Sequence, residues 1–104
     1  MHIPDQHIYY VIFVVTAYES FDDARTKAPD LIAAHIARSK ELRAQGTLLM
    51  SGAFLDNPDK SLSTMAVLTS PEAAEAYING DPFYLKGMVR SWHVHEWANM
   101  FATP

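Results

Sequence analysis

The chain has 104 residues, of which 49% are hydrophobic and 19% are charged, and its formal net charge is -4. A chain of this length can bury one hydrophobic core but not two, so we predict a single domain over residues 1–104. The negative charge and the lack of a Lys/Arg cluster argue against nucleic acid as a partner. Because the chain has no cysteine, disulfide bonds, thiolate chemistry and Cys-ligated zinc are excluded.

The longest continuous apolar stretch, Ile8 to Val15, is too short to span a bilayer. No basic segment precedes it and Tyr18-Glu19 follows it, so it does not resemble a signal peptide. We therefore expect a cytoplasmic protein without a membrane partner.

The first half of the chain predicts a strand, a polar segment and a helix. Residues 8–16 are β-branched or aromatic with apolar side chains on both faces, which is typical of a central strand that needs both faces covered. Residues 17–28 are polar, and we interpret them as a loop with room for a helical turn. Residues 29–45 predict a helix. Pro29 suits the first turn of a helix, and Gly46 is a residue typical of the position just after a helix C-terminus.

His35 lies near the middle of this predicted helix. At about 100° per residue, it falls inside an arc of the helix surface that faces the core. The other residues on that side of the helix are Leu31, Ile32, Ile36, Ser39 and Leu42. An ionisable imidazole in this position is either a hydrogen-bonded core histidine or the base of a site, and the spacing leaves both interpretations open.

A β-hairpin is predicted next. Residues 48–55 and 61–69 read as strands, and the residues between them, 56–60, have turn chemistry. Gly52 would weaken the interior of the first of these strands unless another group must approach the backbone closely.

The remaining segments predict a helix, a short helical turn and a final strand. Ser70 and Pro71 are typical of a helix start, and this helix should end at Gly80. Residues 81–87 repeat the pattern over a shorter length, with an Asp cap, a Pro start and a Gly stop, and residues 88–97 predict the last strand.

The predicted order of elements is βαββαβ, which consists of two split βαβ halves. This order is typical of an α+β, ferredoxin-like fold, with an antiparallel four-stranded sheet and two helices on one face. The first strand is apolar on both sides, so the face without helices would expose a large apolar patch. We therefore predict a homodimer in which a second copy packs on this open sheet face.

An ordered set of short motifs runs from His35 to Trp97. The pieces are the His35 helix with its end at Gly46, then Leu48-Leu49-Met50-Ser51-Gly52, Ser70-Pro71-Glu72-Ala73-Ala74, Asp81-Pro82-Phe83, Gly87, and a last strand ending in Trp97. Taken together, they resemble the YciI-like proteins (YCII-related domain), which belong to the dimeric α/β-barrel group.

This resemblance implies a pocket between helices and sheet with a histidine/aspartate centre. Carried over to this chain, the catalytic residues would be His35 and Asp81, and Ser51, Gly52 and Phe83 would bind the substrate, an unidentified small molecule. Related barrel proteins include muconolactone isomerases and a chlorinated-hydroquinone dehydrochlorinase. The resemblance thus implies isomerase or lyase chemistry on a cyclic carbonyl or aromatic-derived compound without a cofactor.

The chain departs from the family pattern at two positions. Ile32 stands three residues before His35, where the family usually has Arg, and Ala53 follows Gly52, where the family often has Pro. The first departure removes a cation that could bind an anionic substrate.

His35 and Asp81 are far apart in sequence, so only the fold can bring them together. A carboxylate bonded to one ring nitrogen fixes the tautomer and leaves the other nitrogen as a base, which suits proton abstraction next to a carbonyl, isomerisation or elimination. Alternatively, Asp81 only caps a helical turn and His35 only bonds a carbonyl, as in a non-catalytic dimeric binding or accessory protein. A barrel monooxygenase acting on a quinol would give the same sequence pattern.

His93 and His95 lie two residues apart on the last predicted strand and therefore share a face, as the ligands of a metal pair would. No third ligand is evident from the sequence. We expect no metal site, and we place both histidines on the dimer face or the barrel rim. Ser51 lacks the sequence context of a hydrolase nucleophile and is interpreted as a hydrogen-bonding residue of the pocket.

Overall fold

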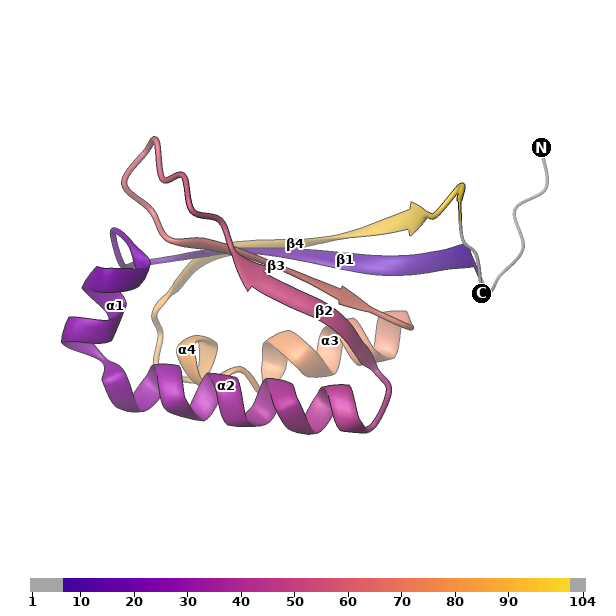
Figure 1. The fold of residues 1–104 in the computed structure, drawn as a ribbon, viewed down its shortest axis with the longest axis horizontal. Helices are drawn as coiled ribbons and strands as arrows, with labels where there is room; N and C mark the ends of the chain where they lie inside the picture. Colours follow the sequence, from indigo (N-terminus) through magenta and orange to yellow (C-terminus); the bar gives the residue numbers. More distant parts are fainter. Residues whose placement is uncertain (1–6, 102–104) are drawn as a thin grey trace.

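The computed structural model describes residues 7–101. Its sheet has the strand order β2-β3-β1-β4, and every neighbouring pair is antiparallel (Figure 1). In chain order the elements are β1 (Ile8–Thr16), α1 (Phe21–Lys27), α2 (Pro29–Ala44), β2 (Leu48–Ala53), β3 (Ser63–Leu68), α3 (Pro71–Asn79), α4 (Pro82–Leu85) and β4 (Val89–Ala98).

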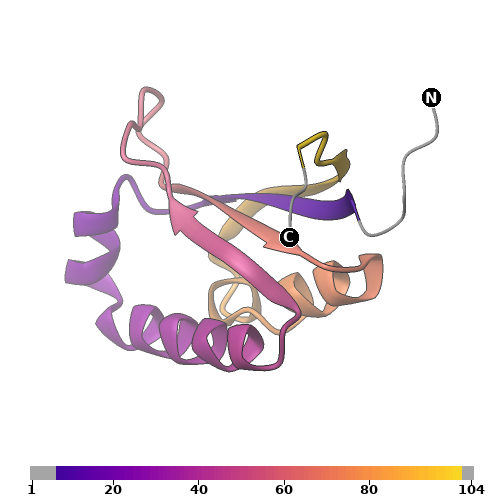
Figure 2. The same ribbon diagram turned by 45° about the vertical axis from the view of Figure 1, so that its right-hand side comes forward.

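The helices lie on one side of the sheet and leave the other side bare (Figures 1 and 2). The fold is α+β and ferredoxin-like, so the predicted fold class is confirmed. The strands of the hairpin are shorter than predicted, since β2 ends at Ala53 and β3 begins at Ser63. No helix within residues 7–101 is long and apolar enough to cross a membrane.

The polar segment after β1, predicted as a loop, contains the seven-residue helix α1. The hydroxyl of Ser20 caps it by accepting a hydrogen bond from the backbone N–H of Asp23 at 3.1 Å. Acidic side chains occupy its first turn and basic ones its last, which suits the helix dipole. The helix is stable in this place because Ala24, which is fully buried, packs with Tyr18 and Phe83 in a small second core. The Ser20 cap can be recognised from neighbouring residues in the sequence, whereas the packing of Ala24 with Tyr18 and Phe83 cannot.

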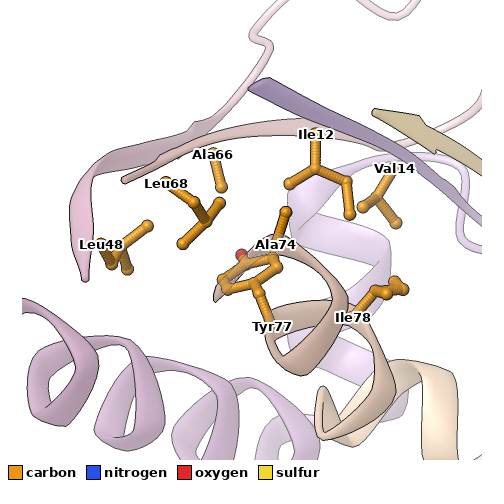
Figure 3. Close-up of a cluster of buried hydrophobic side chains, with 8 residues drawn as sticks. All are labelled: Ile12, Val14, Leu48, Ala66, Leu68, Ala74, Tyr77 and Ile78. Atoms are coloured by element: carbon orange, nitrogen blue, oxygen red, sulfur yellow. The ribbon is translucent and has the colours of Figure 1, made fainter. Parts of the chain in front are cut away.

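The main core lies between the sheet and α3 (Figure 3). Alternate residues of β1, among them Ile12 and Val14, point toward the helices and are buried. Burial of a side chain of this kind contributes roughly 1.5–3 kcal/mol, so this cluster fixes α3 against the sheet. The cluster consists of Ile12, Val14, Leu48, Ala66, Leu68, Ala74, Tyr77 and Ile78.

The face of the sheet without helices carries the other residues of β1. Phe13 faces His93 across the strand pair, with ring centroids 5.3 Å apart, and Tyr9 faces Trp97 at 6.2 Å. Trp97 is 48% exposed and Met50 is 58% exposed. The predicted apolar face is therefore present and uncovered in the single chain; we keep the name open sheet face for it.

Candidate functional site

A pocket of about 320 Å³ lies between the sheet and the helices α1 to α4. Its walls come from segments that are distant in sequence, because α2 packs against α4 and is joined to α3 by hydrogen bonds from Arg38, on the helical side of the sheet (Figure 1). The lining residues are Val14, Thr16, Phe21, Ile32, His35, Ile36, Ser39, Lys40, Arg43, Ser51, Gly52, Ala53, Leu62, Thr64, Tyr77, Asp81 and Phe83. All five residues named from the resemblance are in this lining.

His35 and Asp81 are in direct contact in this pocket. The Nδ1 atom of His35 lies 2.6 Å from Oδ1 of Asp81, and the side chains are 24% and 6% exposed. The other carboxylate oxygen, Oδ2, accepts hydrogen bonds from the backbone N–H groups of Phe83 at 3.1 Å and Tyr84 at 3.3 Å. Asp81 therefore caps α4 and bonds His35 at the same time, so the two interpretations of Asp81 are compatible.

The contact determines which ring nitrogen of His35 is free. When the carboxylate of Asp81 is ionised it only accepts hydrogen bonds, so in that state Nδ1 carries the proton and donates it to Asp81. In the neutral ring the lone pair then lies on Nε2, which makes no hydrogen bond within residues 7–101. Phe83 and Tyr77 pack against the ring, with centroids 5.6 and 6.5 Å away. The arrangement leaves Nε2 able to accept a proton.

Arg38 fixes the end of α3 against α2. Its two terminal nitrogens donate hydrogen bonds of 2.7 Å to the backbone carbonyls of Ala76 and Tyr77. A Cβ atom at Gly80 would lie 2.5 Å from Nη2 of Arg38, so glycine provides the space for the guanidinium group. Because Asp81 follows directly, this interaction holds the segment that carries the carboxylate.

Ser51 and Phe83 both line the pocket. Ser51 pairs with Ala66 of β3 on the side of the sheet that faces the helices, and Phe83 is 7% exposed. Gly52 is also in the lining, and no atom of residues 7–101 lies within 4 Å of the position that a Cβ atom would take.

Tyr77 is a pocket residue that the sequence analysis did not single out. It is 3% exposed, and its hydroxyl makes no hydrogen bond within residues 7–101. Burial, and to a lesser degree the charge of Asp81, raise the pKa of Tyr77 to about 12, while Arg38 acts in the opposite direction. The hydroxyl thus stays protonated and can donate a hydrogen bond. Helical periodicity identifies position 77 only as a core position, so no local signal marks this role.

His93 and His95 lie on the open sheet face, opposite Phe13 and Val11 of β1, and do not line the pocket. Their ring centroids are 4.8 Å apart. Within the part of the chain that the structure describes, no group of three or more His, Cys, Asp or Glu residues could hold a metal ion.

Comparison with solved structures finds the same fold in proteins of low sequence identity. The 5-chloro-2-hydroxyhydroquinone dehydrochlorinase of Burkholderia phenoliruptrix AC1100 is 19% identical, with a TM-score of 0.61 over 86% of this chain and 92% of that one. A putative antibiotic biosynthesis monooxygenase of Nitrosomonas europaea is 12% identical, with a TM-score of 0.58 over 100% of both chains. These similarities establish a shared fold.

Sequence comparison identifies the family. No curated protein matches the chain. The family model for the YCII-related domain matches residues 9–98, which include β1 from its second residue, all of β2 to β4 and every lining residue of the pocket. The chain therefore belongs to the family of proteins with a YCII-related domain.

Proposed function

We propose that this protein is a small-molecule isomerase or lyase of YciI type that works without a cofactor. Its substrate would be a cyclic carbonyl or aromatic-derived compound, with His35 as the general acid/base and Asp81 orienting it. The observation that carries the proposal is the 2.6 Å contact between His35 Nδ1 and Asp81 Oδ1 within a pocket.

The proposed chemistry begins with proton abstraction. Nε2 of His35 takes a proton from a carbon next to the substrate carbonyl, and the C–H electron pair becomes the double bond of an enolate. In an isomerisation, the imidazolium returns the proton to a different carbon. In an elimination, the electrons instead expel a leaving group as its anion. The carboxylate of Asp81 stabilises the imidazolium in both cases.

The pocket supports a substrate of this size and polarity. A volume of about 320 Å³ is at the lower end of the range of pockets that bind small molecules. Apolar side chains such as Ile32, Ile36 and Phe83 could contact a ring. The protonated hydroxyl of Tyr77 and the hydroxyl of Ser51 could donate hydrogen bonds to a carbonyl or enolate oxygen.

One structural neighbour supports elimination as the reaction class. The dehydrochlorinase of Burkholderia phenoliruptrix AC1100 is described in complex with 2,5-dihydroxybenzoquinone, a small ring compound with carbonyl groups.

The proposed assembly is a homodimer through the open sheet face. This face exposes Met50 and Trp97 and carries the aromatic groups Tyr9 and Phe13. A contiguous apolar surface of this kind favours association, and a second copy supplies a surface of identical shape.

The proposed activity is tested with a panel of unsaturated lactones and chlorinated hydroquinones in D₂O. Deuterium incorporation measured by NMR reports proton abstraction, and chloride release reports elimination. We expect the wild type to accelerate at least one reaction, and His35→Gln to reduce that rate about 10²- to 10⁴-fold. Equal rates for the two proteins would refute the role of His35.

The second candidate is a non-catalytic binding or accessory protein. Its support is that Asp81 caps α4, because this structural role accounts for an aspartate at this position without any catalysed reaction. Thermal and chemical unfolding distinguish the candidates. A loss above about 2 kcal/mol in His35→Gln indicates a structural histidine, whereas unchanged or increased stability favours a functional one. A quinol monooxygenase, the third possibility, would consume oxygen in the same panel.

A further inference from the structure

The charged side chains of the pocket are unevenly distributed. Two of the eight Lys and Arg residues of the chain, Lys40 and Arg43, are in its lining. Among residues 7–101, Asp81 is the one acidic residue of the lining, and both its oxygens already accept hydrogen bonds. The pocket of a chain with a net charge of -4 thus has an excess of positive side chains.

Lys40 and Arg43 lie on the same helix as the proposed base, His35, but not beside it. Lys40 and Arg43 follow His35 by five and eight residues on α2. At a rise of ~1.5 Å per residue, this places them roughly 7.5 and 12 Å farther along the helix axis. Ile36 and Ser39, which also line the pocket, lie between them and His35. A ring could occupy this interval with one end at the imidazole and the other at the cations.

Both cations are available to bind an anion. Neither forms an ion pair with a carboxylate of the described residues. Arg43 donates one hydrogen bond, from Nη1 to the backbone carbonyl of Leu49 at 2.6 Å, which holds the guanidinium in place. Its remaining N–H groups, and the ammonium group of Lys40, are free to donate to a carboxylate.

We propose that the ligand of this pocket is an acidic ring compound whose carboxylate binds Lys40 and Arg43 while its reactive end lies at His35. The inference rests on the proposed function for the reactive end only. Ile32 stands where the family pattern has an Arg on this helix, and Lys40 and Arg43 lie two to three turns farther along α2. In this chain the anion therefore binds at the end of the pocket that carries Lys40 and Arg43, and not beside His35.

The test compares two probes of the same shape. 4-Hydroxybenzoate carries a carboxylate, and 4-hydroxybenzamide replaces it with a neutral amide. Binding is measured by NMR titration of the isotope-labelled full chain. We expect the wild type to bind the benzoate roughly ten-fold more tightly, the effect of one charge-assisted contact. This preference should decline as salt is raised, because both cations are exposed.

Variants identify the residues responsible. Lys40→Gln should reduce the preference, and Lys40→Gln combined with Arg43→Gln should abolish it. Lys86→Gln removes the same charge from an exposed residue outside the pocket and should leave the preference unchanged. Because Arg43 also holds the carbonyl of Leu49, thermal melts check that the double variant is folded.

The outcomes separate this inference from the proposed function. His35→Gln should keep the preference for the benzoate even if no catalysis is ever found. Equal binding of the two probes by the wild type, no binding of either at millimolar concentration, or an unchanged preference in the folded double variant would overturn the inference. None of these results would alter the case for His35 as a base.

Discussion

Replacing Asp81 with Asn tests the proposed mechanism most directly, because it separates the two roles of this side chain. The amide oxygen of Asn can still accept the hydrogen bonds from the N–H groups of Phe83 and Tyr84 that cap α4. The amide nitrogen then faces Nδ1 of His35, which must become the acceptor. The proton of the neutral imidazole moves to Nε2, and the base on the pocket side is lost.

From the structure, we expect the substitutions of Asp81 to affect the free energy of unfolding and the reaction rate to different extents. Asn and Asp are similar as helix caps, so Asp81→Asn should lower the free energy of unfolding by about 1 kcal/mol or less. Asp81→Ala removes the cap and leaves two backbone donors unpaired near the buried position, which should cost about 2–3 kcal/mol. Activity should fall about 10²- to 10⁴-fold in both variants.

Three measurements decide the outcome. Urea unfolding gives the free energies of the wild type and both variants, and ¹⁵N NMR of His35 reports which ring nitrogen carries the proton. Deuterium exchange or chloride release gives the activity. If Asp81→Asn keeps full activity, or if His35 keeps its proton on Nδ1, the proposed orienting role of Asp81 is wrong.

Two further predictions concern Tyr77 and the open sheet face. The pKa of Tyr77 is about 12 in the folded state and 10.0 for an ordinary tyrosine, so the folded state favours the neutral phenol. The stability that this preference contributes is intact below pH 10 and is lost as the pH rises toward 12. Between pH 10 and pH 12, the free energy of unfolding of the wild type should therefore fall by about 2–3 kcal/mol more than that of Tyr77→Phe, as measured by urea unfolding. Equal decreases in the two proteins would contradict a buried, protonated hydroxyl at Tyr77. For the assembly, light scattering at micromolar concentration should give twice the chain mass of 11.7 kDa, and a monomer would refute the proposed dimer.

The sequence predicted the order of strands and helices because the relevant signals are local. The β-branched and aromatic run of β1, the Ser70 cap of α3 and the Asp81 cap of α4 each depend on a few neighbouring residues. The α1 helix was interpreted as a loop because polarity outweighed the equally local cap at Ser20.

The tertiary structure decided how the pocket is composed. His35 and Asp81 are 46 residues apart, and they meet because α2 packs beside α4 under one sheet. The accessibility of Tyr77 to the pocket and the open space at Gly52 depend on the same packing. A sequence pattern shows which face of a helix is apolar, but not which element that face will meet. Contacts between distant segments are determined by how the whole core packs, so they became evident only in the folded chain.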